Sequence, residues 1–170
     1  MNVIKAINKR QSIRAYQQKE IEPEKLETIL SAANRAASAG NLQAYHIYVV
    51  RKAEMKQKLA EAAAGQNFLA QAPVVLVFCS DPERSKEKYG EKGVVYAMQD
   101  ACAAVCNVML AAVELGLGTC WVDAVNEQLA AKAINAKNGH IPVVILPIGY
   151  PAEKPPYTTR RELSDIVTEV

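Results

Sequence analysis

The chain contains few of the residues on which familiar catalytic sites depend. Only 2 histidines occur among 170 residues: His46 at the start of a predicted strand and His140 in a loop before another. A Ser-His-Asp or Cys-His site requires a histidine beside its nucleophile, so we interpret both histidines as structural or surface residues. No P-loop lysine motif occurs. The Gly-Leu-Gly at 116–118 lacks the third glycine of a dinucleotide loop and follows a helix, so we interpret it as a helix stop.

Cysteine is also sparse, and its 4 positions form no Cys-x-x-Cys pair. Cys102 and Cys106 are four residues apart and share one helix face, but no further ligand with suitable spacing accompanies them. We therefore expect no metal site and interpret all four thiols as buried small side chains. Reduced thiols in a sequence with no recognisable signal peptide predict a cytoplasmic protein.

Charge of one sign is not in excess, because 20 basic and 18 acidic residues leave a formal charge of +2. A nucleic-acid binder relies on a basic face, so we expect no nucleic-acid partner. Half of the residues are hydrophobic, which argues against disorder. The length is that of one domain, and we expect a single domain over residues 1–170.

Helical and strand-like patterns alternate along the chain after two helices at its start. We expect helices at 2–9, 21–37, 53–64, 93–115 and 126–136, and strands at 46–51, 73–80, 119–124 and 141–151. The apolar run PVVLVFCS is typical of a strand covered on both faces. The charged stretch 81–93 is expected to be a loop. This order predicts an α+β or α/β sandwich in which helices cover a central sheet.

The predicted helix at 93–115 is apolar or small on nearly every side and would span roughly 33 Å. Gln99, Asp100, Asn107 and Glu114 argue against a membrane span. A helix that is apolar all round is expected to be buried all round, and a small domain has difficulty enclosing one of this length. We therefore infer a homodimer, with the central helix of a monomer as the alternative.

Three polar segments remain once the core is assigned. NKRQSIRAYQ gathers three cations and a serine just after the first helix, SAGNLQ follows the second helix, and Arg160 and Arg161 lie near the end of the sequence. The first cluster has two interpretations: a solvated helix C-terminus, or a grip on a fixed anion. The small residues of SAGNLQ allow a ligand to approach the backbone, whereas the alternative is a helix C-cap at Gly40.

Five segments match the motifs of one protein family in the same order along the chain. They are KRQSIRAY, AANRAASAGNLQAYHIYVV, QNFLAQAPVVLVF, ELGLGTCWVDA and LPIGYPAEKPPYTTRRELSDIV. Together they resemble the FMN-dependent nitroreductase family over essentially the whole chain. The resemblance implies a nitroreductase-like α+β sandwich with a mostly antiparallel sheet covered by helices. It also implies a homodimer with a long buried interface helix and an FMN in each of two sites where the subunits meet.

The resemblance also assigns the basic residues. Arg10 and Ser12 would hold the FMN phosphate, with Gln11 between them, and Arg160 would close on the phosphate from the tail. Arg14 would sit near the N1 and O2 edge of the ring system.

Further contacts are implied from three other segments. Ser38, Ala39 and Asn41 would reach the flavin bound mainly by the other subunit. Gln66 or Asn67 would touch the pyrimidine ring. The backbone of one more segment would face the flavin N5 and O4, and it comprises Val122, Asp123 and Ala124.

The implied function is that of an FMN-dependent NAD(P)H oxidoreductase. NADH or NADPH would give hydride to flavin N5, and a small-molecule electron acceptor, such as a nitroaromatic or a quinone, would then take the electrons by ping-pong kinetics. One alternative is an FMN carrier or sensor with little turnover. Another is a protein without flavin that dimerises through the long helix.

Overall fold

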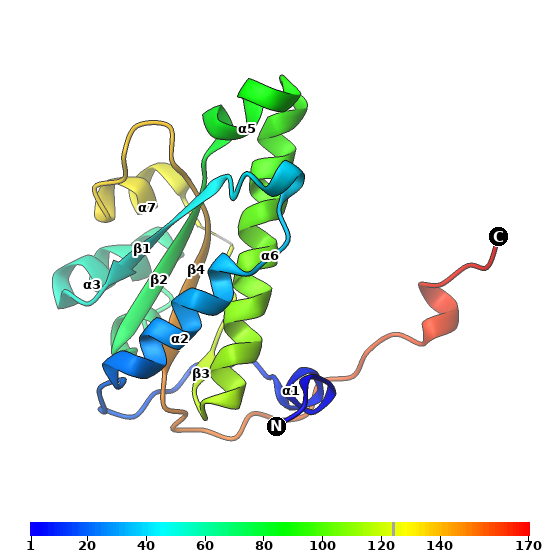
Figure 1. The fold of residues 1–170 in the computed structure, drawn as a ribbon. Helices are drawn as coiled ribbons and strands as arrows, with labels where there is room; N and C mark the ends of the chain where they lie inside the picture. Colours follow the sequence, from blue (N-terminus) through cyan, green and yellow to red (C-terminus); the bar gives the residue numbers. More distant parts are fainter. Residues whose placement is uncertain (124) are drawn as a thin grey trace.

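The computed structural model describes residues 1–123 and 125–170, which form one four-stranded sheet between two layers of helices (Figure 1). The strands are β1 (Tyr45–Val50), β2 (Val74–Ser80), β3 (Gly118–Thr119) and β4 (Ile141–Gly149). The helices are α1 (Val3–Lys9), α2 (Pro23–Asn34), α3 (Ala53–Ala62), α4 (Phe68–Gln71), α5 (Pro82–Tyr89), α6 (Lys92–Glu114) and α7 (Glu127–Ala133). Two 3-10 turns are η1 (Ala39–Asn41) and η2 (Leu163–Asp165).

The sheet has the order β1-β2-β4-β3, and each neighbouring pair is antiparallel. Every residue of β2 is buried, because helices cover both of its faces. Leu76 and Phe78 pack in one core cluster with residues of α2 and α6, and the intervening Val75 and Val77 pack in a second with residues of α3 and α7. The predicted α+β sandwich with an antiparallel sheet is therefore confirmed.

Helix α6 runs along the whole molecule and matches its predicted span to within one residue (Figure 1). By length and composition it could cross a membrane, but it packs as a core helix against α2, α5, β2 and β4. It is not enclosed on every side within one chain, because Val95 is 54% exposed and Met98 49% exposed. Part of its apolar surface is thus open to solvent in the single subunit.

The charged stretch after β2 contains helix α5, so the expectation of a loop over residues 81–93 is wrong. Asp81 caps α5 by accepting a hydrogen bond from the Arg84 amide, and Pro82 occupies the first helical turn. Both are favourable helix-start residues, and they outweigh the high charge of the segment. Helix α5 packs closely on α6, because a Cβ on Gly93 would lie 2.6 Å from the Ser85 backbone.

The strand expected over 119–124 is shorter in the structure. Only Gly118 and Thr119 pair with β4, and Val122 makes one further bridge, to Ile145. The chain therefore touches the sheet edge at two separate points, which leaves the intervening backbone free of strand pairing.

The cysteines do not all have the expected surroundings. Cys79 and Cys120 are buried and Cys102 is half-buried, but Cys106 is exposed. The expectation of four buried thiols is thus wrong for Cys106 within one chain, because this part of α6 faces away from the sheet core.

The last residues of the chain leave the body of the molecule (Figure 1). Large apolar side chains on this tail are more than half exposed, namely Tyr157, Leu163, Ile166, Val167 and Val170. Helix α1 likewise exposes Val3 and Ile4. The single subunit therefore presents apolar surface at both ends of its sequence.

Candidate functional site

The basic segment after α1 is extended and joined to the sheet edge. The Ile13 amide donates to the Thr119 carbonyl at 2.9 Å, and Ser12 forms a parallel bridge with Thr119. The basic segment and β3 approach closely because Gly118 has no side chain: a Cβ there would lie 2.6 Å from Ile13 Cγ1. Only Lys9 belongs to the last turn of α1, so the helix-end interpretation does not account for Arg14.

Three residues of this segment influence the pKa of Cys120, which is buried beside Thr119 at the sheet edge. Burial raises the pKa of the Cys120 thiol, while the Arg14 charge, a hydrogen bond with the Ser12 side chain and the Arg10 charge lower it. Arg10, Ser12 and Arg14, the positions predicted to bind an anion, are spaced two residues apart, and alternate side chains of extended backbone share one side.

The start of the tail lies along the same segment. The Ala152 amide donates to the Ala15 carbonyl at 2.9 Å. The Glu153 carboxylate accepts hydrogen bonds from the backbone amides of Arg14 and Ala15. The two ends of the sequence are thus tied together next to the basic residues, and Glu153 is a contact that the sequence patterns did not indicate.

Residues near both ends of the sequence line one cavity of about 350 Å³. Arg10 and Gln11 contribute from the start of the chain and Tyr157, Thr158 and Arg160 from the tail. Two guanidinium groups, with five donors each, suit a phosphate or carboxylate group. This cavity can hold the phosphate end of a larger ligand.

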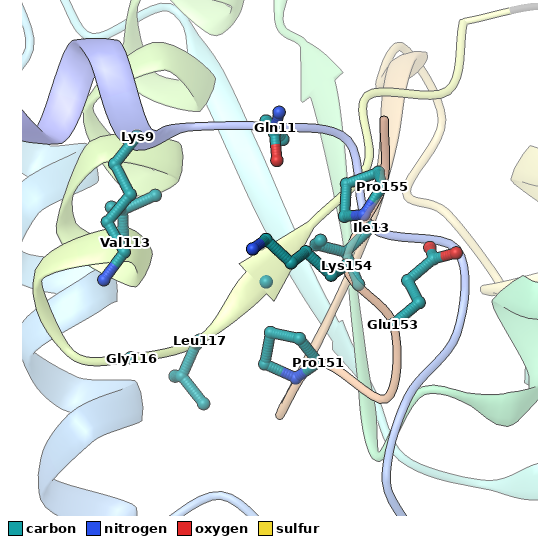
Figure 2. A pocket seen from close by; sticks show the side chains of 11 residues that line it. Lys9, Gln11, Ile13, Val113, Gly116, Leu117, Pro151, Glu153, Lys154 and Pro155 are labelled. Carbon is teal, nitrogen blue, oxygen red and sulfur yellow. The ribbon is translucent and has the colours of Figure 1, made fainter. Parts of the chain in front are cut away.

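A second cavity of about 320 Å³ lies behind the segment (Figure 2). Gln11 and Ile13 line it from the segment, and Leu117 and Gly118 from the end of the turn after α6 and the start of β3. The tail contributes Pro151, Glu153, Lys154 and Pro155. Gly116 has φ +76, and the Leu117 amide donates to the carbonyl of residue 112, so the predicted helix stop is confirmed.

The predicted contacts at Gln66 and Asn67 lie in the turn between α3 and α4. The Asn126 amide donates to the Ala62 carbonyl at 2.8 Å, which joins this turn to the segment after Val122. Asp123 accepts from the Trp121 indole at 3.3 Å. Ala124, the remaining predicted contact of this segment, lies outside the described residues.

The predicted contacts Ser38, Ala39 and Asn41 lie elsewhere in the same chain. Their loop is bonded to Asp100 of α6, whereas the basic segment lies beside Val113 of the same helix. Thirteen residues of helix correspond to about 20 Å along the axis. One chain therefore divides the predicted site residues into two groups at different heights along α6.

Among residues 1–123 and 125–170, no group of three or more histidine, cysteine or acidic side chains could hold a metal ion. The histidines lie on the sheet instead. The His46 and His140 rings stack at 4.8 Å, and the Tyr48 hydroxyl is 2.9 Å from His140 Nδ1.

The structure thus defines an α+β protein in which residues from both ends of the sequence, including Arg10 and Arg160, line one cavity. The chain belongs to the nitroreductase family, whose model matches residues 7–69 and 63–150.

Individual relatives agree with this assignment. The chain is 37% identical over 155 residues to an Archaeoglobus fulgidus protein provisionally named an NADH dehydrogenase/NAD(P)H nitroreductase, covering 89% of this chain and 86% of that one. It is 33% identical over 166 residues to an FMN reductase [NAD(P)H] of Bacillus subtilis, covering 89% and 67%. The structure of NfrA2 from B. megaterium superimposes with a TM-score of 0.91 at 28% identity, covering 99% of this chain and 74% of that one.

Proposed function

We propose that this chain is an FMN-dependent NAD(P)H oxidoreductase. The observation that carries the proposal is the cavity shared by Arg10 and Arg160, since residues from opposite ends of the sequence supply its cations. The residues fit FMN because its phosphate requires charged donors and the Ser12 hydroxyl adds another. Family membership and the B. subtilis FMN reductase support the same cofactor.

The site is proposed to be completed in a homodimer. One chain separates Ser38 and Asn41 from the basic segment by about 20 Å along α6. Exposed apolar residues on α1, α6 and the tail provide the surface for a second copy. In this arrangement the loop of one subunit reaches the cofactor held by the basic segment of the other.

Each segment then has a distinct task. Arg10, Ser12 and Arg160 bind the phosphate. Arg14 is assigned to the N1 and O2 edge of the ring system, where its charge favours negative charge on the reduced cofactor. Asn67 or Gln66 is assigned to the pyrimidine ring, and the backbone of Val122 and Asp123 to the reacting edge.

When bound, FMN supplies hydride acceptance and donation at N5. NADH or NADPH and the electron acceptor therefore use one pocket in turn, which gives ping-pong kinetics. Nitroaromatics and quinones are the proposed acceptors, and the proposed location is the cytoplasm. Protons come from solvent, so the protein needs no catalytic histidine.

The test begins with the absorbance spectrum of the purified protein. We expect flavin bands, bleaching of these bands by NADH or NADPH without oxygen, and their return when a quinone is added. A colourless protein that binds no added FMN would contradict the proposal and favour the interaction protein without flavin. Bound FMN that NAD(P)H does not reduce would favour the carrier or sensor.

A further inference from the structure

Asp100 is the one buried acidic residue in the described part of the chain, with 3% of its surface exposed. It lies in α6, whose other buried residues are Gly, Ala, Val and Met. Its carboxylate has no cation within 4.0 Å among residues 1–123 and 125–170. A buried charge is costly unless hydrogen bonds compensate it, so the partners of Asp100 show what holds it there.

Both partners are backbone amides of one loop. Oδ1 accepts from the Ala39 amide at 2.8 Å, and Oδ2 accepts from the Ala44 amide at 3.3 Å. The two oxygens of one side chain thus hold the two ends of the segment 39–44. Hydrogen bonds to a charged acceptor are shorter and stronger than those between neutral groups.

The loop between these ends has an unfavourable backbone conformation. Gly40, Asn41 and Gln43 have φ values of 57, 58 and 45, and two of these three residues are not glycine. Residues in this left-handed region persist only where their surroundings hold them. Within the loop, the Ser38 hydroxyl accepts from the Gln43 amide at 3.1 Å.

Helix α5 supports the loop from a second side. Arg84 Nε donates to the Leu42 carbonyl at 2.5 Å. The Tyr89 hydroxyl and the Lys88 ammonium would lie 2.4 and 2.7 Å from a Cβ on Gly40. Arg84 and Lys88 are exposed and Tyr89 is half-buried, whereas the Asp100 carboxylate is buried within a packed helix.

We propose that Asp100 is a positioning residue that holds the loop 38–44 in its FMN-binding conformation without contacting FMN. The inference rests on the proposed function, in which Ser38 and Asn41 reach the cofactor of the other subunit. Loss of the carboxylate frees the Ala39 and Ala44 amides, although the Ala44 end keeps another backbone bond, from the Asp81 amide at 2.9 Å. The binding side chains between them must then be ordered when FMN binds. The affinity for FMN then falls by the cost of that ordering.

The test compares Asp100→Asn, Asp100→Ala and a control on the same helix. Asparagine keeps one acceptor oxygen and places an amide donor against the second N–H, whereas alanine removes both acceptors. Asn107→Ala is the control, because Asn107 also ties α6 to a backbone carbonyl, that of Ala32 at 3.1 Å, but not to the loop.

For Asp100→Ala we expect FMN affinity to fall about 10-fold or more in a fluorescence titration, as for the loss of a charged hydrogen bond. Asp100→Asn should show a smaller loss. Asn107→Ala should lower the melting temperature and leave FMN affinity unchanged. Hydrogen exchange at the amides of Ala39 and Ala44 should be slow in the parent without FMN and fast in Asp100→Ala.

Two results overturn the inference. One is a folded Asp100→Asn or Asp100→Ala protein that binds FMN as tightly as the parent. The other is unprotected exchange of the Ala39 and Ala44 amides in the parent, which tests the contact even if both variants fail to fold. A parent protein that binds no FMN contradicts the proposed function instead, so the two failures are distinguishable.

Discussion

The basic segment at 10–14 and the loop at 38–44 are held in place by different means. The basic segment is paired with Thr119 by backbone bonds and lies against Gly118 at the sheet edge. The loop makes no strand pairing from Ala39 to Gln43, and the Ala44 carbonyl at its end accepts from the Asp81 amide. One carboxylate of α6 joins its two ends. The segment therefore takes its shape from the sheet, and the loop takes its shape from a helix.

The difference predicts how each region responds to substitution. Changes in the segment should act through the donors themselves or through its packing on the sheet. Changes around the loop should act through its order, as proposed for Asp100. The first three predictions below test the segment side of this comparison, and the fourth concerns a site outside it.

Arg10→Ala should have the largest effect on cofactor binding. The loss of a charged hydrogen bond costs about 1.5–3 kcal/mol, which corresponds to an FMN affinity about 10- to 150-fold weaker. Isothermal titration with FMN measures the change. Arg161→Ala is the matched control, because Arg161 adjoins Arg160 but does not line the cavity. If the parent and Arg10→Ala bind FMN equally tightly, Arg10 is a solvated residue at the end of α1 and does not bind the phosphate.

Gly118→Ala should separate the basic segment from the sheet edge. The added Cβ would lie 2.6 to 3.0 Å from Ile13 side-chain atoms that include its own Cβ, which cannot move without the backbone. Overpacking of this kind costs about 1–3 kcal/mol in the free energy of unfolding. Urea unfolding measures the loss. Gly139→Ala is a contrasting control: no atom lies within 4 Å of its added Cβ, and only the strain of φ +92 is introduced. An unchanged free energy of unfolding in Gly118→Ala would show that the packing of Gly118 against Ile13 tolerates an added methyl group.

Glu153→Gln should have a smaller effect, because the carboxylate is exposed and glutamine keeps one acceptor. Its contacts with the Arg14 and Ala15 amides become neutral, which weakens the attachment of the tail by about 0.5–1.5 kcal/mol. We expect FMN affinity to fall a few-fold, as measured by fluorescence titration. Glu162→Gln removes the same charge farther along the tail, and it should not alter the affinity. Equal losses in both variants would mean that net charge, not Glu153, is responsible.

The smallest effect is expected at His140, which precedes β4 and lies away from the basic segment, with its Nε2 3.9 Å from Asp81 Oδ2. Burial lowers the pKa of His140, and the neighbouring His46 and Lys137 act in the same direction against Asp81. The native state therefore favours the neutral ring, and the unfolded state binds the proton more readily. Stability should be fully present above about pH 6.5 and decline as the pH falls below it. Unfolding of the parent and His140→Gln at pH 7.5 and 5.5 measures this, and an identical pH dependence would exclude His140 as its source.

Features that depend on residues close together in the sequence were predicted correctly more often than features that depend on distant segments. The span of α6, the strand β2 and the helix stop at Gly116 follow from local pattern, since hydrophobic periodicity and glycine conformation act within a few residues. The helix at 82–89 differs from the expected loop because the Asp81 cap and Pro82 in the first turn favour a helix despite the high charge of the segment. The short β3 could not be foreseen, since strand length depends on the partner strands.

The sequence alone determined which donors are present: the arginines and serine of the opening segment, the small residues of SAGNLQ and the arginine of the tail. Side-chain chemistry is a property of each residue wherever the chain places it. Only the tertiary structure decided that Arg10 and Arg160 share a cavity and that Asp100 holds a loop some sixty residues earlier in the chain. Such contacts arise from the packing of segments distant in sequence, and no local pattern records that packing.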